Sequence, residues 1–92
     1  MLTYTYDEKA LTLTETANGK DIEFRIHILG DASLDQRVKD IGHDFEHNHV
    51  ITDVLFYAFK NHDYQFIVRQ DFYDAFILSL MKHRLLTSVT WV

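Results

Sequence analysis

The pair Asn18-Gly19 lies between two segments in which apolar and polar residues alternate, within the sequence ALTLTETANGKDIEFRIHIL. Such a pair adopts the left-handed conformations of a type I′ turn at little steric cost, and this turn joins antiparallel strands. We therefore predict a hairpin in which Leu13 faces Phe24. Leu11 and Ile26 form the next pair on the same apolar face, and threonines and charged residues occupy the other face.

A second turn at Glu8-Lys9 is predicted to add a strand before this hairpin. It would set Tyr6 against Leu11 and Tyr4 against Leu13, which extends the same apolar rows. The sequence thus predicts a three-stranded meander over residues 2–7, 10–17 and 20–29, with one apolar and one polar face.

A helix is predicted over residues 33–47. Ser33 and Gln36 have the spacing of a capping box, in which both side chains bind free backbone N–H groups at a helix start. An apolar stripe at helical spacing is expected to pack on the sheet and contains Leu34, Val38, Ile41 and Phe45. Gly42 interrupts this helix and is expected to cost about 1 kcal/mol relative to alanine.

Residues 50–59 and 64–69 are predicted to form a second hairpin around Lys60-Asn61-His62-Asp63. If Phe59 faces Tyr64, one side of the hairpin is densely apolar and is expected to face the core. The opposite side is only half apolar, and exposed patches of that composition mark contact surfaces. The candidate interaction surface on this side consists of Val54, Phe56, Ile67 and Arg69.

The end of the chain is predicted to form a helix over 71–84, capped by Asp71, and a last strand over 85–92. The whole chain, 1–92, is expected to be a single α+β domain with a largely antiparallel sheet and two helices on one face. The order βββαββαβ ends in a ferredoxin-like βαββαβ tail. The strand order stays open, because the first hairpin already occupies one edge of the strand that a ferredoxin-like sheet places between two others.

Composition narrows the classes of function. The net charge of −5 disfavours nucleic acid as a partner, because no overall positive field attracts phosphates. The chain has no cysteine, which excludes disulfides and thiolate chemistry. It also has no apolar run long enough to cross a membrane and no signal peptide, so we expect a cytoplasmic protein without membrane contact.

No catalytic motif is evident in the sequence. The only glycines are Gly19, Gly30 and Gly42, which excludes nucleotide-binding loops, and the carboxylate pairs flank predicted helix starts, where acids favour the helix dipole. We therefore expect a protein that is not an enzyme and needs no cofactor. A small-molecule ligand stays open, because pocket shape is not readable from the sequence.

The segment GHDFEHNH, residues 42–49, is a candidate metal site. Histidines four residues apart on a helix can share one ion, so Asp40, His43 and His47 could bind zinc or nickel, with His49 joining from beyond the helix end. The alternative is a solvated helix face whose histidines interact with the helix dipole. Because the second hairpin and second helix carry more apolar surface than one helical layer covers, we favour an interaction module that forms a homodimer or binds another protein as an accessory subunit.

Overall fold

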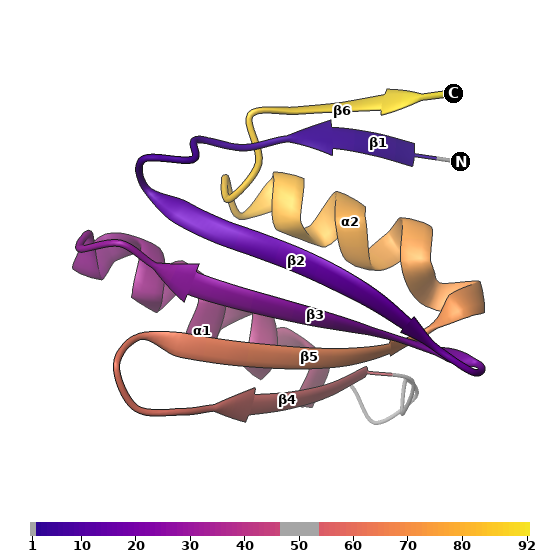
Figure 1. Cartoon of the computed structure of the whole chain (residues 1–92), viewed down its shortest axis with the longest axis horizontal. Helices are drawn as coiled ribbons and strands as arrows, with labels where there is room; N and C mark the ends of the chain where they lie inside the picture. The colour runs from indigo at the N-terminus through magenta and orange to yellow at the C-terminus, as the bar shows by residue number, and fades with distance from the viewer. Residues whose placement is uncertain (1, 47–53) are drawn as a thin grey trace.

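The first hairpin is present, and the main sheet is built on it. The computed structural model describes residues 2–46 and 54–92. Strands β2 (Leu11–Asn18) and β3 (Asp21–Ile28) pair in antiparallel fashion. β3 then pairs with β5 (Asp63–Arg69), and β5 pairs with β4 (Val54–Ala58), which gives an antiparallel sheet of order β2-β3-β5-β4 (Figure 1).

The turn of this hairpin lies one residue later than predicted. Asn18 is the last paired residue of β2, and Gly19 and Lys20 form the turn. Gly19 has a φ of +64°, whereas the φ of Lys20 is not positive. This combination fits a type II′ turn with glycine at its first central position. Leu13 therefore lies opposite Ile26 instead of Phe24. Because this moves the pairing by two residues, every side chain stays on its predicted face.

The predicted meander is wrong in its first strand. β1 (Leu2–Thr5) does not pair with β2; it pairs with β6 (Ser88–Trp91) in a separate two-stranded sheet beside α2 (Figure 1). Asp7 accepts backbone hydrogen bonds from Ala10 and Leu11 at 3.0 and 3.2 Å in the turn before β2. The Thr5 hydroxyl bonds the hydroxyls of Thr87 and Ser88 at 2.7 and 2.6 Å and helps to hold the β1–β6 register.

The fold class is α+β, and the order of the main elements is βββαββαβ as predicted. The ferredoxin-like arrangement is not completed. β3, β5 and β4 take the positions of its first three strands, but β2 occupies the edge of β3 where the last strand would lie. Because that edge is filled, β6 pairs with β1 instead.

Helix α1 spans Ala32–Glu46. Its stripe packs as predicted, since Leu34, Val38 and Ile41 are buried and Phe45 is partly buried against the core. The predicted capping box is wrong. Asp31 Oδ1 accepts hydrogen bonds from the backbone N–H and the hydroxyl of Ser33, at 2.9 and 2.7 Å, and these bonds lower the pKa of Asp31. A carboxylate one residue before the helix satisfies the free N–H groups directly and favours the helix dipole.

The second helical segment begins with a 3₁₀ turn, Gln70–Phe72, and continues as α2 (Tyr73–Lys82). Asp71 lies inside the 3₁₀ turn and is not the N-cap that the sequence predicts. The helix ends two residues earlier than predicted, where Arg84 adopts a φ of +62°. Leu85 N donates to Leu80 O and Arg84 N to Met81 O, both at 3.0 Å, which is a Schellman motif. This ending turns Leu85 and Leu86 back into the core.

Both helices cover the same face of the four-stranded sheet. The centre of the Phe76 ring in α2 lies 4.6 Å from the ring centre of Phe24 and 5.0 Å from that of Phe66. The ring centre of Phe45 in α1 lies 6.0 Å from that of Phe76. Phe24 and Phe66 are paired across β3 and β5 and fully buried. Among residues 2–46 and 54–92, no helix has the length and apolar character needed to span a membrane.

Gly42 has a packing role that its sequence position does not reveal. A Cβ atom at Gly42 would lie 2.5 Å from Cδ2 of Phe56 and 2.8 Å from its Cγ. The helix backbone therefore touches a ring of the sheet, and there is no room for a side chain between them.

Replacing Gly42 with alanine should destabilise the protein by about 1–3 kcal/mol, because the overlap with Phe56 outweighs the gain in helix propensity. Urea denaturation measures the free energy of unfolding. In a protein that already carries Phe56→Leu, adding Gly42→Ala should cost less stability than it does in the wild type. The smaller leucine leaves space for the added methyl group. A stabilising Gly42→Ala would contradict the close approach.

Candidate functional site

The interaction surface predicted at Val54, Phe56, Ile67 and Arg69 is not one surface. Ile67 and Arg69 lie on the outer face, away from the helices, as predicted. Val54 is only 9 % exposed and lies opposite the buried Val68, and Phe56 lies opposite the buried Phe66. These two residues face the core, so the prediction for β4 is wrong.

The length of the β4–β5 loop causes this error. Phe59 N donates to Asp63 O at 2.8 Å, so the loop contains the three residues Lys60, Asn61 and His62. Asn61 and His62 have φ values of 64° and 63°. The predicted register requires a loop of two or four residues, and a change of one residue exchanges the two faces of a strand. Tyr64, Phe66 and Val68 of β5 are buried as predicted, and only β4 is reversed.

The outer face of β4 nevertheless carries large apolar side chains. Leu55, Tyr57 and Phe59 are 51, 45 and 47 % exposed, and Leu55 lies opposite the half-buried Ile67. The guanidinium of Arg25 lies 4.9 Å from the centre of the Phe59 ring. We call Leu55, Tyr57, Phe59 and Ile67 the outer patch. It replaces the surface predicted from the sequence and lies on the same hairpin.

β4 is also an edge strand. In the part of the chain that the structure describes, its only strand partner is β5, so one side of its backbone is unpaired by any strand. Residues 54–59 contain no charged residue, proline or glycine. Edge strands of proteins that stay apart are protected by such residues or by bulges. β4 shows no such protection in its sequence.

The candidate metal site is only partly described. Asp40 accepts a hydrogen bond from Gln36 at 2.9 Å, and His43 is exposed on α1. His47 and His49 lie outside the described residues. Among residues 2–46 and 54–92, no three histidine, aspartate or glutamate side chains come together as a metal site. Binding of zinc or nickel by this segment stays a prediction from the sequence.

A buried carboxylate anchors the β4–β5 loop. Asp35 on α1 is 7 % exposed and accepts hydrogen bonds from the Tyr64 hydroxyl at 2.6 Å and from His62 Nδ1 at 3.0 Å. Burial raises the pKa of Asp35, but the bonds from Tyr64 and His62 and the nearby positive charges outweigh it, so the pKa lies below its ordinary value. Burial and the same carboxylate raise the pKa of Tyr64 to about 12. These contacts fasten the loop to the helix.

A second carboxylate joins three elements of the fold. Glu15 of β2 accepts hydrogen bonds from the hydroxyl of Tyr4 in β1 at 2.5 Å and from that of Tyr73 in α2 at 3.1 Å. Burial first, and then Glu15, raise the pKa of both tyrosines, that of Tyr73 to about 12. Both hydroxyls therefore stay protonated and donate to Glu15 at neutral pH.

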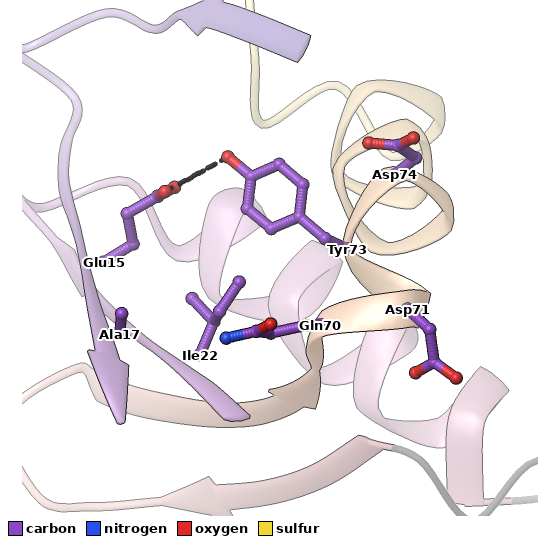
Figure 2. A pocket seen from close by; sticks show the side chains of 7 residues that line it. All are labelled: Glu15, Ala17, Ile22, Gln70, Asp71, Tyr73 and Asp74. Atoms are coloured by element: carbon purple, nitrogen blue, oxygen red, sulfur yellow. Dashed lines mark hydrogen bonds between the residues drawn. The ribbon is translucent and has the colours of Figure 1, made fainter. Parts of the chain in front are cut away.

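A cleft of about 410 Å³ opens beside Glu15. The hairpin β2–β3 forms one wall and the start of the second helical segment the other, as Figure 2 shows. Gln70 reaches back to the hairpin, since its Nε2 donates to Gly19 O at 2.8 Å and its backbone N to Lys20 O at 3.0 Å. The cleft is lined by Glu15, Ala17, Ile22, Gln70, Asp71, Tyr73 and Asp74.

Sequence reasoning missed both carboxylate sites, although each left a signal. Glu15 follows Leu11 and Leu13 on the inward row of β2, where an apolar residue is expected. Asp35 lies one residue after Leu34 in α1 and shows no such break in pattern. Its burial results from the three-residue loop, which places His62 and Tyr64 over it.

Comparisons with known proteins give no relative from which a function could be transferred. No family model matches the chain, and neither the curated proteins nor the solved structures compared with it give a significant match. The site must therefore be argued from its own chemistry.

Replacing Asp35 with asparagine should lower stability at neutral pH by about 1–3 kcal/mol, because a charged acceptor for Tyr64 and His62 is lost. It should also change the pH dependence. Since the folded-state pKa of Asp35 lies below its ordinary value of 3.8, its contribution is present above that value and is lost as pH falls through the folded pKa.

Urea denaturation over a series of pH values tests this expectation. The free energy of unfolding of the wild type should fall more steeply below about pH 4 than that of Asp35→Asn. Asp40→Asn, which removes the same charge from the same helix, should keep the wild-type slope. Equal flattening in both variants would assign the effect to net charge alone.

Proposed function

We propose that the protein is a non-enzymatic interaction module that forms a homodimer through β4 and the outer patch. The observation that carries the proposal is that Leu55 and Tyr57 of the edge strand β4, and Phe59 just after it, are each about half exposed. Contiguous apolar surface of this kind on the outside of a protein marks a contact region. The proposal takes the protein to be cytoplasmic, as the sequence predicts.

Strand addition is the mode of contact that β4 favours. An edge strand offers a row of unpaired backbone N–H and C=O groups, and a second strand can bind them while alternate side chains pack beside it. Among the described residues, those of β4 that point outward are apolar, so a strand added at this edge would extend an apolar row instead of a polar one.

A second copy of the chain fits this edge. Two identical strands paired in antiparallel fashion about a two-fold axis present the same residues to each other, so Leu55, Tyr57 and Phe59 of one copy would meet those of the other. Each copy carries a net charge of −5, and copies of like charge repel. Residues 54–59 contain no acidic residue, so β4 is a place where two copies can approach without opposed carboxylates.

Sedimentation velocity at micromolar concentration tests the proposal. The wild type should sediment as a dimer, and Tyr57→Lys should raise the dissociation constant at least about thirtyfold, because a charge would be buried without a partner, a loss of about 2 kcal/mol or more. Tyr57 points outward, so the free energy of unfolding of the monomer should change little.

The matched control is Leu78→Lys, which places the same charge on an apolar residue of α2 that is 50 % exposed. This variant should dimerise like the wild type. A wild type that is monomeric at all concentrations, or equal losses in both variants, would contradict dimerisation through β4. A monomer that binds another protein, with binding lost in Tyr57→Lys, would instead identify an accessory subunit.

A further inference from the structure

The cleft beside Glu15 has the size and lining of a small-molecule site. Its volume of about 410 Å³ lies within the range of ligand pockets, about 300–1,000 Å³. Ala17 and Ile22, which face each other across β2 and β3, give the hairpin wall an apolar surface. Such sites combine apolar walls with a few polar groups that fix the orientation of the ligand.

Glu15 supplies the oriented polar group. An ionised carboxylate has about four acceptor positions. Tyr4 occupies one on Oε2, and the Tyr73 hydroxyl lies 3.1 Å from both oxygens. Acceptor capacity therefore remains for an N–H donor. Because two hydroxyls from two other elements hold it, the carboxylate is fixed before any ligand arrives, which lowers the entropy cost of binding.

The charge around the cleft selects for a cation. Among the seven lining residues three are acidic and none is basic. Figure 2 shows Asp71 and Asp74 on the helix side of the cleft, across from Glu15, where they add negative potential. Lys20 and Arg69 line a separate, smaller hollow that shares Gln70 and Asp71 with the cleft.

Glu15 is exposed, so its carboxylate is accessible to a ligand while it accepts both tyrosine hydroxyls. Glu15 continues the inward row of Leu11 and Leu13 and is the only charged residue on the inward row of β2. Local departures from an otherwise consistent pattern concentrate at functional sites.

We propose that this cleft binds an alkylammonium ligand, whose charged end pairs with Glu15 and whose apolar stem lies on Ala17 and Ile22. The ammonium group donates to the free acceptor positions of Glu15, and the Tyr73 ring borders the stem. The same chemistry is offered by a free organic amine and by a lysine side chain, and the experiment below separates them. The site is independent of β4 and of dimerisation.

The test is a titration followed by the amide chemical shifts of the 92-residue protein. n-Butylammonium should give saturable shifts at Ala17, Ile22 and Tyr73, and n-butanol and butyrate should give none. A capped Gly-Lys-Gly tripeptide forms the second arm. Binding of the tripeptide as well as the amine would assign the site to lysine side chains, and binding of the amine alone would assign it to a free ligand.

Two variants and one control make the result specific. Glu15→Gln should weaken binding of n-butylammonium at least about tenfold, since a charge-assisted hydrogen bond is lost. Ala17→Phe fills the cleft while leaving Glu15 and its tyrosines in place, and should also abolish binding. Glu8→Gln removes the same charge from an exposed turn and should bind like the wild type.

The proposal is overturned by any of three results. These are the absence of saturable shifts with both cations, equal shifts with n-butanol, or unchanged binding in Ala17→Phe. If Glu15→Gln does not fold, Ala17→Phe decides the outcome, because it alters only the space in the cleft.

Discussion

The Phe76 ring joins the three parts of the core. It packs against Phe24 and Phe66 of the sheet and against Phe45 of α1, so one side chain of α2 fixes both helices on the same sheet face. Aromatic pairs at these separations add to the free energy of area burial. The inward rows of β2, β3 and β5 are buried under this cover.

The strand that fills the edge of β3 determines the rest of the topology. β2 lies there because a two-residue turn connects it to β3, and a local turn forms at much lower entropy cost than a return from α2. β6 is consequently left without a place in the main sheet and forms a second sheet with β1. The cleft at Glu15 lies between the β2–β3 hairpin and the start of the second helical segment, as Figure 2 shows.

Local patterns in the sequence were sufficient for most of the fold. The alternation in β2 and β3 and the stripe of α1 predicted their buried faces, because each pattern depends only on the period of its element. The reversal of β4 could not be predicted in the same way. The reversal depends on left-handed backbone conformations at Asn61 and His62. Asparagine and histidine can adopt this conformation but are also common elsewhere, so their presence does not predict the three-residue loop.

The second source of error was the pairing between elements that lie far apart in the sequence. Nothing near Tyr4 or Tyr6 indicates that β1 pairs with β6 instead of β2, since both arrangements bury the same apolar row. The cleft was invisible for a related reason. It is made by Glu15 and Tyr73, which are 58 positions apart and belong to elements whose packing the sequence does not specify.

The β1–β6 ladder has a consequence for how the chain folds. It joins positions as far apart as Leu2 and Trp91, whereas the four-stranded sheet is complete once Arg69 has been synthesised. Closing the longest loop carries the largest entropy cost, so this ladder forms after the sheet and opens before it. During translation both hairpins can form before β6, the partner of β1, has been synthesised.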